Sequence, residues 1–409
     1  MKPDQPWRKG RRKTRHFRGG VFRFPAHHPL AARAGFGLSV RMTEPRLTPL
    51  AASLPAAVPF VGPEAQERAR GRAFSARLGA NENVFGPSPM AISAMQNAAK
   101  DTWMYGDPEN HHLKNALAQH HAIAPENIMV GEGIDGLSGY LVRLLVDKGD
   151  KVVTSAGAYP TFNYHVAGFG GELVTVPYAG DHEDPEALVQ KAAEVGAKLV
   201  YIANPDNPMG TWHDSATIEK MIRALPEGCI LVLDEAYLEF APAGTAPPLA
   251  PQTPGVIRMR TFSKAYGMAG ARVGYAIGAE LLITAFNKIR NHFAMCRISQ
   301  AGALAALKDQ AYLAQTVENV RAARVRINDI AQENGLTTVP SATNFVAIDC
   351  GADAAFAKRV LDGLIAQDVF VRMPFVAPQN RCIRLSAGRP QDLDLFAQAL
   401  PKALEAARG

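Results

Sequence analysis

The stretch that decides the fold of this chain reads Thr261-Phe262-Ser263-Lys264-Ala265-Tyr266-Gly267-Met268-Ala269-Gly270-Ala271-Arg272-Val273-Gly274. It places one lysine, Lys264, among small and hydroxyl-bearing residues, and Arg272 follows eight positions later. A lysine amine can lose its proton and attack a carbonyl carbon, which suits covalent chemistry. Taken alone, however, a lysine in a loop of small residues is more often structural than catalytic. The rest of the sequence has to decide between these two interpretations.

Apolar segments of strand length surround this stretch and recur through the central part of the chain. We expect strands at Ile128–Val130, Lys151–Thr154, Leu173–Val176, Lys198–Ala203, Ile230–Leu233, Val256–Arg260 and Val273–Gly278. Helical patterns separate most of them, and this alternation is typical of an α/β domain. The sequence therefore predicts a mainly parallel seven-stranded sheet flanked by helices. Functional sites in such sheets lie at the carboxyl ends of the strands, where the polar motifs of this chain also occur.

The sequence indicates four regions. Residues 1–41 form a basic leader, and residues 42–77 form an N-terminal arm whose prolines exclude a long helix. Residues 78–290 form the large domain that contains the sheet. Residues 291–409 form a smaller α+β domain, because short apolar strands and a last helix follow long helical patterns there. Helices are expected at 63–70, 89–99, 109–121, 280–293, 299–308 and 310–334.

The leader accounts for the net positive charge of the chain. It contains eleven Lys or Arg residues and one acid, Asp4, whereas the remaining sequence has 33 basic and 37 acidic residues. Three interpretations stay open: a disordered arm that binds nucleic acid, an organellar transit peptide, or translated sequence upstream of a true start at Met42. We favour the last interpretation, because the composition changes at Met42.

Two sequence features exclude other classes of protein. No run of about eighteen apolar residues is present, so we expect no membrane span. The four cysteines are scattered and form no C-x-x-C pair. This pattern indicates reduced thiols in a cytoplasmic protein, with neither a disulfide framework nor a metal site.

Polar residues that follow the strands match the partners that pyridoxal phosphate needs. Lys264 would bond covalently to the aldehyde of this cofactor. Asp234 ends a strand and would keep the pyridinium nitrogen protonated, so that the ring accepts electrons; the ring cation would in turn hold the buried carboxylate ionised. Asn207 and Tyr237 would donate hydrogen bonds to the phenolate oxygen.

The phosphate group and the face of the ring need partners of their own. Backbone N–H groups at a helix start bind phosphate, and hydroxyl groups and an arginine add further donors. An aromatic side chain can stack on the ring. The residues expected in these roles are Gly133, Ile134, Asp135, Thr261, Ser263 and Arg272 for the phosphate, and Tyr159 for the ring.

Each of these features has a structural explanation when it is taken alone. Asp234 would serve as a helix N-cap, and Tyr159 would pack in the core. The loop at 131–136 fits the dinucleotide pattern G-x-G-x-x-G, but the acid expected at the end of the next strand is absent. The features occur together, in one order and mostly after strands, and this agreement favours the cofactor site.

From about Leu78 to the C-terminus, the chain resembles the fold-type-I pyridoxal phosphate aminotransferases of class I/II, and within them it is most similar to the histidinol-phosphate aminotransferases. The motifs that carry the resemblance are Asn81-Glu82-Asn83, Tyr105-Gly106-Asp107-Pro108, the loop at Gly133, Asn204-Pro205-Asp206-Asn207-Pro208-Met209-Gly210, Asp234-Glu235-Ala236-Tyr237, Ser263-Lys264 with Arg272, and Arg384.

The resemblance implies further roles. Arg384 would bind the carboxylate of the substrate through two hydrogen bonds. Tyr105 would reach the cofactor phosphate of the neighbouring subunit, which implies a homodimer with shared active sites. Asn83 would contact the substrate. Members of the family that use histidinol phosphate are expected to bind its phosphate with two arginines, here Arg384 and Arg372, and with an N-terminal tyrosine.

The position of that tyrosine departs from the pattern of the family. The family segment typically reads Pro-Tyr-x-Pro-Gly, whereas this chain has Pro59-Phe60-Val61-Gly62-Pro63. Phe60 has no hydroxyl group to donate, and this difference bears on which amino donor the chain accepts.

The implied function is transamination from histidinol phosphate to 2-oxoglutarate, with imidazole acetol phosphate and glutamate as products. Lys264 would act as general base and acid, with Asp234 and Tyr237 supporting the ring. An aminotransferase for aromatic or other α-amino acids is the alternative, and a decarboxylase similar to the threonine-phosphate decarboxylases is a further one. A protein of another class, a nucleic-acid-binding regulator with a degenerate cofactor domain, is disfavoured because every cofactor partner is present.

Overall fold

The structure, a computed structural model, describes residues 45–56 and 61–409. The expected leader at 1–41, the start considered at Met42 and the Phe60 position lie outside the described residues. Leu47–Gly409 form one unit, which contains every helix and strand described below.

A seven-stranded sheet organises this unit, as the sequence predicts. In order across the sheet, its strands are β2 (Ile128–Gly131), β8 (Gly274–Gly278), β7 (Val256–Thr261), β6 (Ile230–Asp234), β5 (Leu199–Ala203), β3 (Lys151–Ser155) and β4 (Glu172–Val176). The five strands from β7 to β4 pair in parallel, whereas β8 is antiparallel to both of its neighbours. The carboxyl ends of the parallel strands therefore meet at one edge.

Helices cover both faces of this sheet. They are α3 (Pro89–Ala99), α4 (His111–His121), α5 (Gly133–Leu145), α6 (Thr161–Gly168), α7 (Pro185–Val195), α8 (Ser215–Arg223), α9 (Glu280–Ala285) and α10 (Arg297–Lys308). The face that includes Val232 packs against α5 and α6, whose Leu141 and Phe162 are buried in the same cluster. The opposite face packs against α7 and α8 on one half and against α3, α4 and α10 on the other. The sheet is thus the middle layer of three.

Side-chain caps fix where several of these helices begin. The Ser88 hydroxyl accepts a 3.1 Å hydrogen bond from the backbone N–H of Ala91, and Pro89 occupies the first turn of α3. The Asp184 carboxylate accepts two backbone N–H groups at the start of α7, which ends at Gly196 in the left-handed conformation. These are the usual start and stop signals of helices, and they need no tertiary contact.

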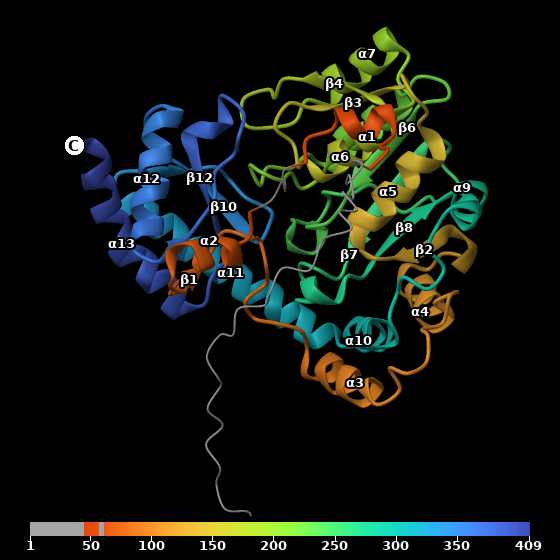
Figure 1. Ribbon diagram of the computed structural model, residues 1–409, viewed down its shortest axis with the longest axis horizontal. Helices are drawn as coiled ribbons and strands as arrows, with labels where there is room; N and C mark the ends of the chain where they lie inside the picture. Colours follow the sequence, from red (N-terminus) through yellow and green to blue (C-terminus); the bar gives the residue numbers. More distant parts are fainter. Residues whose placement is uncertain (1–44, 57–60) are drawn as a thin grey trace, which may run out of the picture. The chain divides into compact units, whose positions relative to one another are not determined.

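A smaller α+β domain completes the chain. Its elements are α11 (Gln310–Glu333), β9 (Thr337–Thr338), β10 (Phe345–Asp349), α12 (Ala354–Ala366), β11 (Val369–Phe370), β12 (Cys382–Ser386) and α13 (Pro390–Arg408). β9, β10 and β12 form an antiparallel sheet, and α12 and α13 pack together beside it (Figure 1). Val360 and Phe396 are fully buried in this core.

The N-terminal arm contacts both domains: Leu50 lies close to Gly170 of the large domain, and Ala76 and Arg77 pair with the smaller domain. It contains α1 (Pro49–Ser53), α2 (Pro63–Arg70) and β1 (Ala76–Arg77). β1 pairs in parallel with β11, so segments nearly three hundred residues apart lie side by side. Two features differ from the expectations: α1 is an additional helix, and α9 ends at Ala285 with a 3₁₀ turn, Phe286–Lys288, where we expected a helix to residue 293.

In the part of the chain that the structure describes, no helix is long and apolar enough to span a membrane.

Candidate active site

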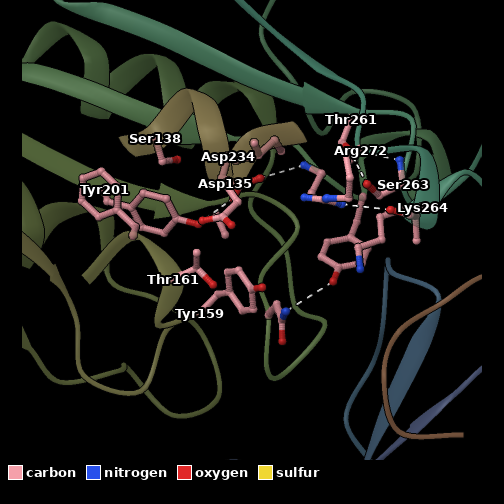
Figure 2. A pocket seen from close by; sticks show the side chains of 17 residues that line it. Asp135, Ser138, Tyr159, Thr161, Tyr201, Asp234, Thr261, Ser263, Lys264 and Arg272 are labelled. Atoms are coloured by element: carbon pink, nitrogen blue, oxygen red, sulfur yellow. Dashed lines mark hydrogen bonds between the residues drawn. The ribbon is translucent and has the colours of Figure 1, made fainter. Parts of the chain in front are cut away.

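A cavity of about 140 Å³ lies at the edge of the sheet where the parallel strands end, and Figure 2 shows its lining. β6 ends there with Asp234, β7 ends with Thr261, and Lys264 follows in the next loop. The lining includes the predicted cofactor residues Ile134, Asp135, Tyr159, Asn207, Asp234, Tyr237, Thr261, Ser263, Lys264 and Arg272. The structure therefore brings together residues from several loops and from the start of α5.

The amine of Lys264 faces this cavity and is held by a main-chain oxygen. Its Nζ donates a 3.1 Å hydrogen bond to the carbonyl of Asn81 and lies 5.4 Å from the centre of the Tyr237 ring. Burial lowers the pKa of Lys264, so its amine gives up a proton more readily than a lysine in water. An amine of this kind suits both a nucleophile and a proton carrier.

Asp234 is buried at the end of β6, and both of its oxygens have protein partners. Oδ2 accepts a 2.6 Å hydrogen bond from the Tyr201 hydroxyl, and Oδ1 accepts a 2.9 Å bond from the backbone N–H of Ala236. Burial raises the pKa of Asp234 to about 6, although these hydrogen bonds oppose the rise. A neighbouring cation would lower that pKa, which fits an acid that faces a protonated ring nitrogen.

The residue after Asp234 links the end of β6 to the neighbouring strand β7. Glu235 is buried and accepts hydrogen bonds from Nε of Arg258 at 3.0 Å and from Nε of Arg260 at 2.8 Å. Although burial favours protonation, Arg260 and Arg258 hold the pKa of Glu235 below its ordinary value. The pair Asp234-Glu235 thus presents one carboxylate to the cavity and uses the other to fix the strand ends.

Tyr237 and Asn207 form a polar group beside Lys264. Nδ2 of Asn207 lies 3.3 Å from the Tyr237 hydroxyl, and Nδ2 of Asn81 lies at the same distance. Burial raises the pKa of Tyr237 to about 12, so its hydroxyl keeps its proton and can donate. Oδ1 of Asn207 accepts a hydrogen bond from Nη1 of Arg384. This network links the cofactor candidates to the substrate candidate Arg384.

The start of α5 and the loop after β7 form the phosphate end of the cavity. Gly133 has φ of +82°, and a Cβ there would lie 2.7 Å from Nη2 of Arg272. A side chain at Gly133 would therefore displace the guanidinium group. The Thr261 and Ser263 hydroxyls are bonded to each other at 2.9 Å. Backbone N–H groups, hydroxyl groups and one arginine therefore converge, as an anion site requires.

Asp135 lies at the same helix start, where a carboxylate would repel a phosphate. Nε2 of His165, on α6, lies 2.7 Å from Oδ1 of Asp135. This hydrogen bond lowers the pKa of Asp135. Because the histidine engages the carboxylate, the backbone N–H is the part of Asp135 that an anion would meet, and its role in phosphate binding stays a prediction.

A second cavity of about 190 Å³ adjoins the first, and both are lined by Lys264, Asn207 and Tyr159. The second cavity also holds Arg372 and Arg384, which pair across their strands: Arg384 N–H donates to the Arg372 carbonyl at 2.6 Å. Tyr159 is 38% exposed and lies at both cavities. The predicted substrate arginines are thus next to the lysine.

The two arginines have spare capacity to bind an anion. In the described part of the chain neither has a salt-bridge partner, and Nε of Arg384 is buried without a hydrogen bond. Burial lowers the pKa of Arg384 to about 10, and the nearby Arg372 adds to this effect. A carboxylate or a phosphate would satisfy both charges.

The N-terminal arm reaches the second cavity. Nη2 of Arg372 donates a 2.7 Å hydrogen bond to the carbonyl of Val61. Val61 follows Phe60, the residue expected at the tyrosine position of the family. Phe60 itself lies outside the described residues, so its predicted contact with the substrate stays a prediction.

Among the described residues, three predicted site residues line neither cavity: Gly133, Asn83 and Tyr105. Asn83 is 8% exposed, and its amide donates to the carbonyls of Lys264 and Ala265 at 3.0 and 3.2 Å. It therefore fixes the loop of the lysine within this chain. Tyr105 is 77% exposed, and its ring lies 4.8 Å from that of Phe293.

Comparison with known proteins agrees with this geometry. The family model "Aminotransferase class I and II" matches residues 76–400. A histidinol-phosphate aminotransferase from Anaeromyxobacter sp. (strain Fw109-5) is 37% identical over 368 residues, which cover 88% of this chain and 100% of that protein. This chain belongs to the class I and II aminotransferases.

Solved structures of related aminotransferases share this fold. The histidinol-phosphate aminotransferase from Sinorhizobium meliloti, in complex with pyridoxal-5'-phosphate, is 54% identical with a TM-score of 0.87, over 89% of this chain and 99% of that one. A mutant of Thermus thermophilus aspartate aminotransferase has a TM-score of 0.75 at 24% identity, over 88% and 99% of the two chains, and it shows the fold alone. The chain is a fold-type-I, pyridoxal phosphate-dependent aminotransferase.

The residues of this aminotransferase fit its cofactor. The lysine amine, the buried Asp234 and the anion site at Gly133 lie around one cavity. Gly133 leaves room for Arg272. Burial raises the pKa of Asp234, and a cation beside it would stabilise its ionised form. These features match an aldehyde, a phosphate and a ring nitrogen on one molecule.

Several residues of the aminotransferase site were not predicted from the sequence. Tyr201 is the most informative, because it holds Asp234; Asn81, Ser138 and Thr161 also line the cavities. Strand register could have identified Tyr201: Ala203 pairs with Asp234, so Tyr201, two residues earlier, lies on the same face. Asn81 could have been found in Asn81-Glu82-Asn83, where we selected Asn83 instead.

Proposed function

We propose that this aminotransferase transfers the amino group of histidinol phosphate to 2-oxoglutarate and forms imidazole acetol phosphate and glutamate. The observation that carries the proposal is the pair Arg372 and Arg384, which lie in the cavity beside Lys264 without salt-bridge partners among the described residues. Such a pair suits a doubly charged phosphate. The names of the most similar relatives support the same donor.

The positions of the predicted cofactor residues support the following roles. Pyridoxal phosphate supplies an aldehyde that exchanges amino groups and a ring that accepts electrons. With the cofactor bound, Lys264 would hold its aldehyde in the resting enzyme, and the Nζ atom, once free, would take the proton from the substrate carbon that carries the amino group. Asp234 keeps the ring nitrogen protonated, and Tyr237 and Asn207 donate to the ring oxygen. Thr261, Ser263, Arg272 and the N–H groups of Gly133, Ile134 and Asp135 hold the phosphate, and Tyr159 covers the ring.

The same arginines serve both halves of the reaction. The phosphate of the amino donor and a carboxylate of 2-oxoglutarate are both anions that a guanidinium group binds through paired hydrogen bonds. Because the two substrates use one site in turn, ping-pong kinetics should follow.

We also propose that the enzyme is a cytoplasmic homodimer. Trp103, Tyr105 and Phe293 are 81%, 77% and 54% exposed, and the rings of Tyr105 and Phe293 lie 4.8 Å apart. A second copy would cover these rings and bring Tyr105 to the neighbouring cofactor phosphate. Sedimentation equilibrium of the native protein and of Trp103→Ala tests this state; a monomeric native protein would contradict it.

An amino-donor panel tests the proposed function. The enzyme, loaded with pyridoxal phosphate, is given 2-oxoglutarate together with histidinol phosphate, phenylalanine, tyrosine or aspartate, and glutamate is measured. We expect histidinol phosphate to have the largest kcat/KM. A larger value for phenylalanine or tyrosine would replace the proposal with an aromatic aminotransferase, and carbon dioxide release without glutamate would indicate a decarboxylase.

A further inference from the structure

The loop that follows Arg372 is apolar where it borders the substrate cavity. It reads Met373-Pro374-Phe375-Val376, and its first three residues line the cavity together with Lys264. Phe375 is 74% exposed, so most of its ring is not packed against the protein. An exposed phenylalanine on an open surface needs no explanation, but this ring borders the cavity of the reactive amine.

The loop around Phe375 is held in place on both sides. Arg372 pairs with Arg384 before it, and the N–H of Asn380 donates a 2.9 Å hydrogen bond to the carbonyl of Val376 after it. The Arg381 guanidinium then forms a 2.9 Å salt bridge with Asp181. The backbone therefore presents Phe375 at a defined position.

The loop also closes one side of the cavity. Gly157 has φ of +97°, and a Cβ there would lie 3.1 Å from Cβ of Val376. The two loops thus approach each other so closely that only glycine fits without a shift. Tyr159 lines the cavity from the loop of Gly157, and Phe375 lines it from the loop of Val376.

Two kinds of side chain therefore line the cavity. Arg372 and Arg384 offer cations for an anion, and Phe375 offers an aromatic ring for an apolar or unsaturated group. Of the two proposed substrates, the amino donor has an anion and an imidazole ring, whereas 2-oxoglutarate has two anions and no ring. Two planar unsaturated rings attract each other in edge-to-face or offset arrangements.

We propose that Phe375 selects the amino donor by contacting its ring, and that it has no part in binding 2-oxoglutarate. This inference rests on the proposed function for the identity of the donor. It makes Phe375 a specificity-determining residue that acts in one half of the reaction only.

The test measures the two half-reactions separately by stopped-flow absorbance of the cofactor. For Phe375→Ala, we expect kcat/KM for histidinol phosphate to fall about 10-fold and kcat/KM for 2-oxoglutarate to stay within about twofold of the native value. Phe375→Tyr should keep the native ratio of the two values. Because Phe375 is mostly exposed, these variants should fold; Phe169→Ala, which removes an exposed ring that lines neither cavity, is the matched control.

Several results would overturn the inference. They are an equal loss in both half-reactions for Phe375→Ala, no loss in either, and a Phe375→Leu variant as active on the ring-bearing donor as the native enzyme. If histidinol phosphate is not accepted but tyrosine is, the proposed function fails, and the same ratio measured with tyrosine still decides the role of Phe375. If no ring-bearing donor is accepted, both proposals fail.

Discussion

The hydroxyl of Tyr201 donates a 2.6 Å hydrogen bond to Oδ2 of Asp234, and both residues are buried. Tyr201 lies on β5, next to β6, and its ring stacks on Phe162 at 4.7 Å with an interplanar angle of 19°. The carboxylate that we propose for the ring nitrogen of the cofactor is therefore oriented by a tyrosine that is itself packed in the core. Such support is typical of functional groups that must hold one geometry.

Removal of this hydroxyl should weaken cofactor binding. We expect Tyr201→Phe to raise the Kd for pyridoxal phosphate about 10-fold, because a hydrogen bond to a charged group contributes about 1.5–3 kcal/mol. Absorbance titration of the ligand-free protein measures this Kd. Tyr312→Phe is the control, because its hydroxyl donates to the carbonyl of Phe85 and lines neither cavity. An unchanged Kd for Tyr201→Phe would show that Asp234 does not depend on this bond.

The stability of the ligand-free enzyme should depend on the protonation of Asp234. Burial raises the pKa of this acid from 3.8 in the unfolded chain to about 6, so the folded protein holds the proton more tightly. Unfolding then releases a proton between about pH 4 and 6, and the contribution of Asp234 to the free energy of unfolding falls by about 2–3 kcal/mol as the pH rises. Asp234→Asn removes this dependence.

Urea denaturation from pH 4.5 to 7.5 measures that effect. We expect the free energy of unfolding of Asp234→Asn to increase relative to the native protein as the pH rises. Asp394→Asn, which changes an exposed carboxylate on α13, should show no such trend. A constant difference between Asp234→Asn and the native protein would contradict the buried, proton-binding state of Asp234.

The phosphate end of the site gives a prediction about Gly133. Gly133→Ala should raise the Kd for pyridoxal phosphate about 10- to 100-fold, because φ of +82° strains alanine and its Cβ would displace Arg272. Gly180→Ala is the control, because Gly180 also has positive φ but a Cβ there would meet nothing within 4 Å. Equal effects of the two substitutions on the Kd would show that the guanidinium position is unimportant.

Arg384 should matter for both substrates. We expect Arg384→Ala to weaken the binding of the phosphate- or carboxylate-bearing substrate by about 2–4 kcal/mol. The substitution removes the cation of the buried ion pair that Arg384 would form with the bound substrate. Steady-state kinetics should show a raised KM for histidinol phosphate and for 2-oxoglutarate. If neither KM changes, Arg384 does not belong to the substrate site.

Much of the fold could be predicted, because the strands of the sheet are continuous apolar segments whose pattern needs no tertiary information. The antiparallel direction of β8 and the pairing of β1 with β11 could not be predicted, because both depend on which distant segments pair in the folded chain. The expected helix at 280–293 was too long, because the chain leaves the helix at Ala285 for a 3₁₀ turn. The domain boundary expected at residue 290 stays a prediction; α10 packs on α3 and α4, which favours a boundary near Asp309.

The cofactor site was more predictable than the substrate site. Residues such as Lys264 and Asp234 follow strands, so the topology alone gathers them at one edge. The hydrogen bond from Tyr201, the turn of Asn83 toward the backbone of Lys264 and the exposure of Phe375 depend on side-chain direction. A sequence motif does not specify that direction.

Borohydride reduction followed by peptide mass spectrometry would show whether Lys264 carries the cofactor. Reduction of the native enzyme should attach a phosphopyridoxyl group to Lys264, and Lys264→Ala should lose the label, the absorbance of the covalently bound cofactor and, by at least about 10²–10⁴-fold, turnover. A label on another lysine, or a Lys264→Ala variant that keeps the absorbance and normal activity, would contradict the account.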